Sequence, residues 1–343
     1  MVKLEYVWVD GCDPWGMRSK VRIIDATDDQ LVRLSSLDHR SIPSWSFDGS
    51  STSQAETSNS DCLLEPVRVF LDPLGAYDYI VFCEVKNHDG SVHESNMRAP
   101  LIEIARMCED KEPSFGFEQE YFFMVAGKPL GFPPEGYPEP QGIYYCSAGS
   151  DRAFGRGIAD THMQACIGAG LSITGTNAEV APGQWEYQIG GPDCGPVEAA
   201  DQLWLSRWLL IKVAEAYDVS ISFDPKPLVG DWNGSGCHTN FSTLSMRQDG
   251  GLQAIEEACE KLSNNVERHT NSYGTGLGRR LTGLHETSSI DTFTWGVSDR
   301  TASVRIPAVV KSDGCGYLED RRPNSNCDPY RVANAILLTV CIN

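Results

Sequence analysis

Two glutamates separated by a single residue are the most informative feature of this chain. Glu118 and Glu120 lie in the aromatic-rich segment 115–123, and because residues two apart along a strand share a face, their side chains would stand about 7 Å apart on one side. The other side carries an almost wholly apolar set that predicts contact with a core: Phe117, Gln119, Tyr121 and Phe123. Two such carboxylates repel each other unless a cation lies between them, and Mg²⁺ or Mn²⁺ suits carboxylate oxygens. An exposed edge strand with two solvated glutamates is the alternative interpretation.

Further carboxylates recur in strand-like settings downstream. The segment 177–188 supplies Glu179 and Glu186 across a Pro-Gly turn, and Glu319 lies between Tyr317 and Arg321 in an alternating pattern. Each of these groups alone is more typical of a solvated or salt-bridged side chain. Together with Glu118 and Glu120 they make five glutamates, which is enough oxygen for more than one hard cation.

A glycine-rich segment, 226–242, is the second strong pattern. Its sequence Asn233-Gly-Ser-Gly236 lets backbone amides come close to an anion or substrate, because glycine has no side chain to intrude. His238 follows directly and could complete a metal site, although a structural histidine is the alternative. The segment 273–278, Tyr-Gly-Thr-Gly-Leu-Gly, also resembles a phosphate-binding loop, but no clear strand precedes it.

The charge distribution narrows the class of ligand. The chain has a net charge of −19, which argues against a nucleic-acid partner because phosphates require a basic face. Six arginines nevertheless gather in the last fifth of the chain: Arg279, Arg280, Arg300, Arg305, Arg321 and Arg322. Carboxylates, one histidine and clustered arginines together favour phosphoryl chemistry on a metal-bound nucleotide, and these residues alone leave the acceptor open.

The cysteine pattern and the hydropathy of the chain predict where in the cell the protein is found. Twelve cysteines include no C-x-x-C pair, and no apolar signal region follows the charged start. The two N-x-S sequons, at Asn233 and Asn240, fall inside the glycine-rich segment, where a glycan would block a ligand. No apolar run reaches the length of a membrane span. These patterns predict a soluble, cytoplasmic protein with reduced thiols and no membrane partner.

The order of elements predicts two domains in 343 residues. Alternating or apolar segments predict strands over 3–9, 20–24 and 79–85, and a long polar loop covers 48–61. Helical spacing predicts helices over 98–110, 197–217 and 252–262. We therefore expect an α+β protein with a small β-rich domain over residues 1–95 and a larger catalytic domain over residues 96–343.

Taken in order, the motifs resemble glutamine synthetase over nearly the whole chain. The resemblance rests on Phe47-Asp-Gly-Ser-Ser51, the glutamates above, the glycine-rich segment, Arg280-Leu-Thr-Gly-Leu-His-Glu286, the segment 299–307 and Glu319-Asp-Arg-Arg-Pro323. The short length and the opening Glu5-Tyr-Val-Trp-Val-Asp-Gly11 are similar to the type II, eukaryotic-like branch. The family implies an N-terminal β-grasp domain and a catalytic half-barrel, a curved antiparallel sheet backed by helices. One departure is Ser114, where relatives commonly have an aromatic residue, and it is expected to loosen the nucleotide end of the cleft.

The resemblance also implies the roles of individual residues. Two or three Mg²⁺ or Mn²⁺ ions per site would be held by two ligand sets: Glu120, Glu179 and Glu186, and Glu118, His238 and Glu319. Glutamate would be bound by Asp231, Trp232, Asn233, Gly234, Arg280 and Arg321. ATP would be bound by Glu118, Glu186, Asn240, Ser242, Arg247, Arg300, Arg305 and Tyr317. Catalysis would involve Arg300, Arg305 and an ammonium site formed by Asp48, Glu286 and Tyr145.

The implied reaction is the ATP-dependent ligation of ammonia to the γ-carboxylate of glutamate, through γ-glutamyl phosphate. The implied assembly is a homo-oligomer, a decamer of two stacked five-membered rings, in which Asp48 reaches the site of a neighbouring subunit. A γ-glutamyl-amine ligase that uses another amine is the nearest alternative. A catalytically inactive structural relative is a further alternative, but every proposed metal and arginine position is filled in this sequence.

Overall fold

The computed structural model describes residues 1–342, which form two compact units. The first contains residues 1–100 together with 165–171, and the second contains residues 101–164 and the chain from 172 onward. The domain division after residue 95 stays a prediction. Across residues 1–342, no helix combines the length and apolar character that crossing a lipid bilayer would take.

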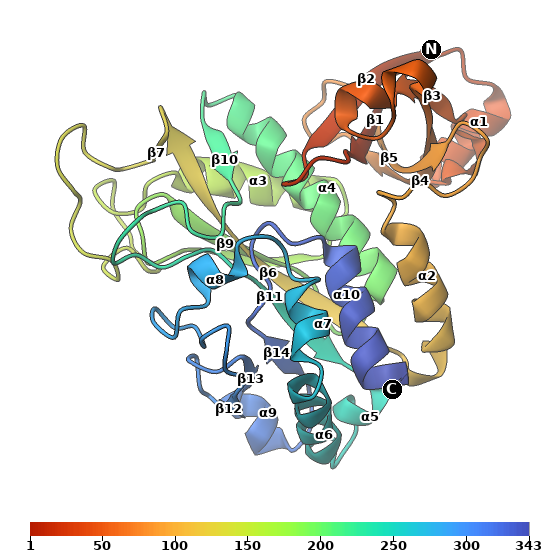
Figure 1. Cartoon of the computed structure of the whole chain (residues 1–343). Helices are drawn as coiled ribbons and strands as arrows, with labels where there is room; N and C mark the ends of the chain where they lie inside the picture. Colours follow the sequence, from red (N-terminus) through yellow and green to blue (C-terminus); the bar gives the residue numbers. More distant parts are fainter. Residues whose placement is uncertain (343) are drawn as a thin grey trace. The chain divides into compact units, whose positions relative to one another are not determined.

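The first unit is built on a five-stranded sheet with the order β2-β1-β5-β4-β3 (Figure 1). Strands β1 and β5 pair in parallel at its centre, and the other neighbours pair antiparallel. The elements are β1 (Val2–Val9), β2 (Met17–Ile24), α1 (Asp28–Ser35), η1 (His39–Ser41), β3 (Trp45–Asp48), η2 (Gly49–Thr52), η3 (Thr57–Asn59), β4 (Asp61–Leu71) and β5 (Tyr79–Asn87). A central parallel pair in a mixed sheet with one helix agrees with the expected β-grasp arrangement.

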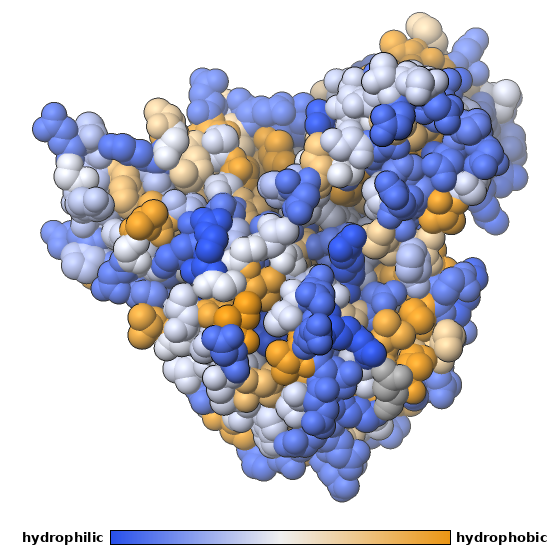
Figure 2. Space-filling view, viewed as in Figure 1, coloured by the Kyte–Doolittle hydropathy of each residue, from blue (hydrophilic) through white to orange (hydrophobic). Residues whose placement is uncertain are grey.

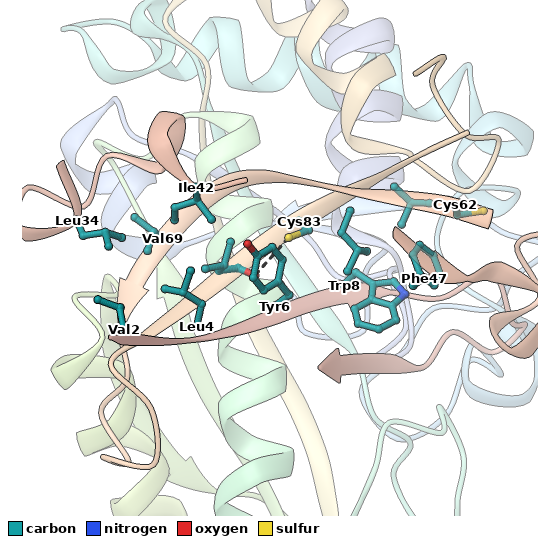
Figure 3. Close-up of a cluster of buried hydrophobic side chains, with 13 residues drawn as sticks. Val2, Leu4, Tyr6, Trp8, Leu34, Ile42, Phe47, Cys62, Val69 and Cys83 are labelled. Carbon is teal, nitrogen blue, oxygen red and sulfur yellow. Dashed lines mark hydrogen bonds between the residues drawn. The ribbon is translucent and has the colours of Figure 1, made fainter. Parts of the chain in front are cut away.

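One hydrophobic cluster of this unit lies on one face of the sheet, because alternate residues of each strand point the same way. Leu4 and Tyr6 of β1 are fully buried, and Leu34 of α1 closes the cluster (Figure 3). The Tyr6 hydroxyl donates a hydrogen bond of 2.8 Å to the Pro43 carbonyl oxygen, and burial raises its pKa to about 12. The three strands predicted from sequence are all present as β1, β2 and β5.

Strands β3 and β4, helix α1 and the short helices η1 to η3 of the first unit were missed by pattern alone. Strand β4 contains Pro66, which removes a ladder hydrogen bond, and the register shifts there between Pro66 and Arg68. Helix α1 is short, but it begins with a capping box in which Thr27 and Gln30 bond reciprocally. That capping box was the available sequence signal for a helix.

The second unit contains a nine-stranded curved sheet whose main path runs β12-β13-β14-β11-β6-β9-β8, with β7 and β10 also paired to β6 (Figure 1). Its strands are β6 (Ser114–Val125), β7 (Lys128–Pro129), β8 (Ile173–Ala178), β9 (Gln184–Gly190), β10 (Ser220–Ser222), β11 (Cys237–Ser242), β12 (Trp295–Val297), β13 (Val304–Ile306) and β14 (Leu318–Asp320). Helices against the sheet give the expected half-barrel. The prediction of an antiparallel sheet is wrong in one place, because β12 pairs with β13 in parallel.

Three helices of the described chain beyond α1, namely α2, α4 and α6, were predicted from their spacing of apolar residues. The helices beyond α1 are α2 (Arg98–Met107), η4 (Glu109–Lys111), α3 (Arg156–Gly168), α4 (Pro196–Glu215), α5 (Leu244–Arg247), α6 (Leu252–Ser263), α7 (Val266–Thr270), α8 (Leu277–Arg280), α9 (Ala308–Asp313), α10 (Pro329–Leu337) and η5 (Leu338–Ile342). Helix α6 buries Ile255 and Leu262 and exposes Gln253 and Glu257. Figure 2 shows the hydrophilic side of this amphipathic helix at the bottom of the view.

Helix α4 covers the back of the sheet and carries a buried charge there. Arg207 donates two hydrogen bonds, of 2.9 and 2.7 Å, to the side-chain oxygen of Gln119 on β6. Gln119 lies between Glu118 and Glu120 but points to the opposite face, as the alternation predicts. The back of β6 is therefore locked by packing and hydrogen bonds, which fixes the strand that carries the two glutamates.

Candidate active site

Strand register gathers the predicted carboxylates on the front face of the sheet. In the β6–β9 and β8–β9 pairings, Glu120 lies opposite Glu186, and Glu186 lies opposite Asn177. In the β11–β6 pairing, His238 lies opposite Glu118. Residues opposite each other on neighbouring strands have Cβ atoms about 5 Å apart, so side chains distant in sequence meet in rows.

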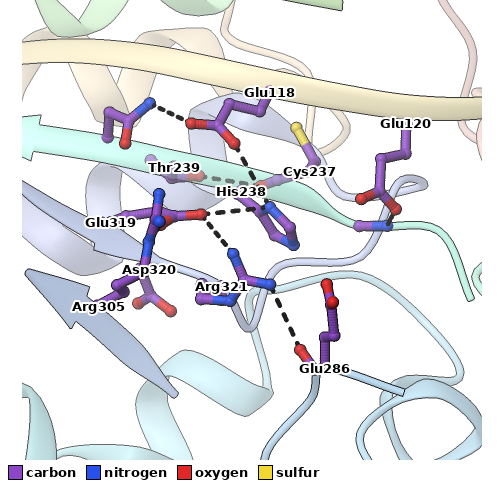
Figure 4. A network of polar contacts seen from close by, with 12 residues as sticks. Glu118, Glu120, Cys237, His238, Thr239, Glu286, Arg305, Glu319, Asp320 and Arg321 are labelled. Carbon is purple, nitrogen blue, oxygen red and sulfur yellow. Dashed lines mark hydrogen bonds and ion pairs between the residues drawn. The ribbon is translucent and has the colours of Figure 1, made fainter. Parts of the chain in front are cut away.

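One cluster of possible metal ligands joins Glu118, His238 and Glu319. The Nδ1 atom of His238 lies 3.5 Å from a Glu118 oxygen and 3.4 Å from a Glu319 oxygen (Figure 4). Burial lowers the pKa of His238 well below its usual value, and the nearby Arg321 acts in the same direction. The imidazole is therefore neutral, which is the form that binds metals.

A second cluster joins Glu120, Glu186 and His238. The sequence-based hypothesis put Glu179 in this set in place of His238. Glu179 lines the same pocket, but Asn177 donates to one of its oxygens over 3.0 Å and the Val180 backbone N–H donates to the other over 3.2 Å. The structure thus brings all six predicted ligands into one region, with His238 shared by two candidate sets.

Three carboxyl groups of this region are protonated more readily than those of ordinary glutamates. Burial raises the pKa of Glu120 to about 7 and that of Glu179 to about 8, with neighbouring glutamates adding to the shift. Burial followed by the repulsion of Glu118 raises the pKa of Glu186 well above its usual value. Uncompensated buried carboxylates are costly, and divalent cations would restore their charged form. Oxygen ligands plus one neutral imidazole fit Mg²⁺ or Mn²⁺.

These groups line a cavity of about 530 Å³, which we call the charged pocket. Its wall contains Glu118, Glu120, Gly142, Tyr145, Asn177, Glu179, Val180, Glu186, Gln188, Asn233, Gly234, His238, Arg280, His285, Glu286, Thr287, Arg300, Arg305 and Arg321. Acidic side chains from β6, from β9 and from the residue after β8, together with His238 of β11, therefore face arginines from the C-terminal third of the chain. A site of this kind can hold cations and phosphate oxygens together.

Two arginines are tied to Glu319, which is itself fully buried. Arg321 donates to one Glu319 oxygen over 2.7 Å, and Arg305 donates to the other. The pairing follows from register, because Arg305 on β13 lies opposite Glu319 on β14. Burial opposes the charge of Arg305, but the Glu319 carboxylate outweighs it and raises the pKa of Arg305.

Arg280 uses most of its hydrogen-bond donors within the protein. Its Nε donates to the Asn324 side chain over 2.8 Å, and its Nη2 donates to the three carbonyl oxygens of residues 321–323. Burial lowers its pKa to about 10. Arg280 lines the pocket, but the prediction that it holds a substrate carboxylate rests on its Nη1 alone, which lies close to Gly236.

The glycine-rich loop approaches Arg280 closely. A Cβ atom on Gly234 would lie 2.6 Å from the Arg280 side chain, so a larger residue would displace one of them. Two other predicted glutamate-binding residues, Trp232 and Asp231, are not among the residues that line the charged pocket. Trp232 is buried in an apolar cluster with Phe122, and the exposed Asp231 carboxylate lies 3.2 Å from His285. The side chain of Trp232 is therefore structural.

A separate cavity of about 380 Å³, the apolar pocket, contains the remaining predicted nucleotide residues. Its wall is Ser114, Phe115, Gly116, Phe117, Thr174, Gln188, Ile189, Gly190, Gly191, Pro192, Asn240, Phe241, Ser242, Arg247, Gly316 and Tyr317. Asn240 connects the two pockets, because its amide donates to Glu118 over 2.8 Å. The Ser114 hydroxyl donates to the Gly191 carbonyl over 2.6 Å, so this serine is held against the wall.

Asp48 belongs to the first unit, at the end of β3. Ser50 and Ser51 donate to its carboxylate over 2.6 and 2.8 Å, and these bonds lower its pKa. The polar loop that follows is held to the rest of the first unit, since the Gly11 N–H donates to the Thr52 carbonyl oxygen over 2.9 Å. A charged carboxylate at the start of this ordered loop suits binding of a cation.

Several site residues were missed from the sequence. Asn177 and Gln188 bracket the glutamates of β8 and β9 and hydrogen-bond to each other over 3.0 Å, yet they appeared only as the flanks of a motif. His285 and Gln141 gave no signal of their own. Conversely, none of the residues 273–278 is among those that line the two pockets, and Tyr273 is fully buried and donates to Asp320 over 2.7 Å.

Comparisons with known proteins agree with this geometry. The family model described as "Glutamine synthetase, catalytic domain" matches residues 103–269. The chain is 50% identical to a glutamine synthetase of Streptomyces viridochromogenes, over 99% of this chain and 96% of the relative. It is 48% identical to "Glutamine synthetase 1, mitochondrial" of Drosophila melanogaster, over 100% of this chain and 84% of that protein. It is 46% identical to "Glutamine synthetase 2 cytoplasmic" of the same species, over 100% and 92%.

Identity at this level runs through both compact units, so it covers the polar loop of the first as well as both pockets of the second. With these matches and a curved sheet that carries the charged pocket, the chain belongs to the glutamine synthetase family, in its type II, eukaryotic-like branch.

Proposed function

We propose that the charged pocket is where this chain performs the reaction of its family. That reaction is the ligation of ammonia to the γ-carboxylate of glutamate with hydrolysis of ATP to ADP and phosphate. The observation that carries the assignment is the convergence of buried carboxylates and arginines on one cavity wall. Such a wall accommodates an anionic nucleotide only when cations are present, and family membership implies a divalent metal.

Two or three Mg²⁺ or Mn²⁺ ions are proposed for each site. Glu118, His238 and Glu319 would hold one ion, and Glu120 and Glu186 would hold another with Glu179 or His238. When bound, these ions would neutralise phosphate oxygens and raise the electrophilicity of the γ-phosphorus. Neutral His238 and the fixed strand positions of the glutamates support this assignment.

The nucleotide would span both pockets. Its base and ribose suit the apolar pocket, where Asn240, Ser242, Arg247 and Tyr317 lie, and its phosphates suit the charged pocket. The glutamate γ-carboxylate would attack the γ-phosphorus as ADP leaves, giving γ-glutamyl phosphate. Arg300 and Arg305 would stabilise the equatorial oxygens during transfer, and Arg321 with the 231–234 loop and Arg280 would hold glutamate.

The second half-reaction needs a proton acceptor. Ammonium would bind near Glu286, Tyr145 and Asp48, where negative charge favours the cation and helps to remove its proton. Free ammonia then attacks the acyl carbon, and phosphate leaves. Glu286 is held at the pocket by its backbone, since Arg321 donates to its carbonyl oxygen over 3.4 Å.

Assembly and location are part of the proposal. Asp48 belongs to a different compact unit from the pocket, which supports a shared site between subunits of a decamer of two stacked five-membered rings. A cytoplasmic location is supported by the twelve free cysteines of the described chain. The relatives carry names for more than one compartment, so a tagged chain followed by microscopy is the direct test of location.

The test of the proposal separates the two half-reactions. Asp48→Ala should still form ADP slowly from ATP and glutamate while losing ammonium-dependent glutamine formation. Unaffected glutamine synthesis at saturating ammonium would remove Asp48 from the site. Mixing Asp48→Ala with Arg321→Ala subunits after dissociation should restore some activity if sites are shared. A complete lack of complementation, with assembly verified by light scattering, would favour sites built within one chain.

A γ-glutamyl-amine ligase is not favoured, because the relatives over the full chain are glutamine synthetases. Offering the enzyme a panel of amines alongside ammonium decides the point. Preference for a larger amine at equal concentration would contradict the assignment.

A further inference from the structure

Gln141 joins three loops at the mouth of the charged pocket. It lies in the proline- and glycine-rich stretch 131–142 and contacts Asn233 of the glycine-rich loop and His285 of the loop before Glu286. None of the roles assigned above involves Gln141. Its neighbour Gly142 and both of its partners line the pocket wall.

The orientation of the Gln141 amide is fixed by a backbone donor. The Asn233 N–H donates to Oε1 of Gln141 over 2.7 Å, and a backbone N–H can only donate. The amide nitrogen of Gln141 must therefore face the other way. It donates to Oδ1 of Asn233 over 2.8 Å and lies 3.4 Å from Nδ1 of His285.

This arrangement also decides which atoms of Asn233 and His285 act as donors and which act as acceptors. Because Oδ1 of Asn233 accepts from Gln141, the Nδ2 end of Asn233 remains for a ligand, and the described residues make no hydrogen bond to it. Because Nδ1 of His285 accepts, its proton is on Nε2, which donates to the Asp231 carboxylate over 3.2 Å.

The loop bearing His285 needs such support. His285 and Glu286 are consecutive non-glycine residues in the left-handed region, with φ of 55° and 58°. Each costs about 1 kcal/mol or more in that conformation, and such strain persists only where surrounding contacts hold it.

We infer that Gln141 is a positioning residue that turns the Asn233 amide so that its N–H donors face the charged pocket, ready for a carboxylate of the amino-acid substrate. The inference rests on the proposed function, in which Asn233 contacts glutamate. An amide in the opposite orientation would present a carbonyl oxygen to a carboxylate, and two acceptors repel. Gln141 thus acts through Asn233 without touching the substrate itself.

Gln141→Glu tests the inference with almost no change in shape. A carboxylate still accepts from the Asn233 N–H but cannot donate to its Oδ1, so the Asn233 amide should reverse. We expect the KM for glutamate to rise about tenfold, the KM for ATP to stay within about twofold, and the melting temperature to stay unchanged. Gln253→Glu, on the exposed face of α6, is the matched control for the added charge. Equal rises in both KM values, or none, would overturn the inference.

A double-mutant cycle gives the second readout. Asn233→Ala should raise the KM for glutamate about tenfold in the natural background but under about twofold in Gln141→Glu, where the donor has already turned away. Additive effects would overturn the inference. If Asn233→Ala alone leaves the KM for glutamate unchanged, the assignment of Asn233 fails, and the inference fails with it. If Gln141→Glu does not fold, Gln141→Met, which also lacks donors, enters the same cycle.

Discussion

The two faces of the nine-stranded sheet bury charge in opposite ways. On the front face, Glu120, Glu179 and Glu186 converge, and burial raises the pKa of each. On the back face, Asp320 is fully buried beside Arg322 at 2.5 Å and also accepts from Tyr273. Burial acts to raise the pKa of Asp320, but the Arg322 guanidinium outweighs it and keeps that pKa below its ordinary value.

On β14, Glu319 and Asp320 are consecutive and point to opposite faces, and each is paired with arginine, so the contrast lies in the other front-face acids. On the back face, Arg322 neutralises Asp320, and Tyr273 donates a hydrogen bond to it. Hydrogen bonds then connect Tyr273 to His269, and His269 to Thr339.

Glu120, Glu179 and Glu186 on the front face make no ion pair with a lysine or arginine of the described chain, whereas Glu319 is paired with Arg305 and Arg321. A balanced cluster stabilises the fold, whereas an unbalanced one creates affinity for a missing cation, and this difference identifies the functional face.

The largest effect is expected from Glu120→Gln on the front face. This change removes a charged ligand, so glutamine formation should fall at least about 10³-fold and the number of bound metal ions should decrease. Calorimetric titration with Mn²⁺ and a steady-state assay measure both. Glu103→Gln, on the exposed surface of α2, is the control and should change neither. An unchanged metal count would remove Glu120 from the ligand set.

On the back face, Asp320→Asn should lower the free energy of unfolding by about 3–5 kcal/mol, because Arg322 would be left buried without its partner. Urea denaturation at fixed protein concentration measures the change. The double variant Asp320→Asn, Arg322→Gln should recover part of the loss, since both charges are then absent. If Asp320→Asn lowers the free energy of unfolding by less than about 1 kcal/mol, the ion pair between Asp320 and Arg322 is not what neutralises the buried charge on the back face.

Metal removal should make stability depend on pH through the front face. A carboxyl whose pKa rises on folding holds more protons in the folded state, so the free energy of unfolding falls as pH rises between its two pKa values. With Glu120 at about 7 and Glu179 at about 8, metal-free protein should lose on the order of 2–4 kcal/mol from each of these two carboxyls between about pH 5 and pH 8. Saturating Mg²⁺ should abolish the loss. If Glu120→Gln leaves the dependence of the free energy of unfolding on pH unaltered, Glu120 is not the origin of that dependence.

The smallest effect is expected from Tyr273→Phe, which removes one hydroxyl between His269 and Asp320 on the back face. Stability should fall by about 1 kcal/mol, and kcat should stay within about twofold. Thermal unfolding and a steady-state assay measure the two quantities. A large fall in kcat at unchanged stability would show that the back face also serves the reaction.

Much of the site could be predicted from residue types. The alternation of Glu118 and Glu120 against Phe117 and Tyr121 predicted a strand with its acids on one side but left an exposed edge strand open, and the structure places β6 inside the sheet. The family resemblance then identified the other ligands by motif, and the charged pocket contains them, with buried Glu319 beside it in the His238 cluster.

Other features could not be read from the sequence, because they depend on contacts between segments distant along the chain. The bonds that commit Arg280 to residues 321–323 come from folding alone, as does the burial of Trp232 beside Phe122. The sharing of His238 between two acidic clusters depends on the register of β11 against β6. The sequence also gave no reason to notice Gln141.

By itself, the sequence determined which chemistry is possible, because residue type decides charge, hydrogen-bonding capacity and affinity for hard cations. Strand periodicity also determined that the acids of β6 share one face, since side chains alternate along any strand. Only the tertiary structure decided which acids are neutralised by the protein and which are left for a ligand. That difference depends on the register of neighbouring strands and on burial, which place Arg322 beside Asp320 and leave Glu120 and Glu186 facing each other.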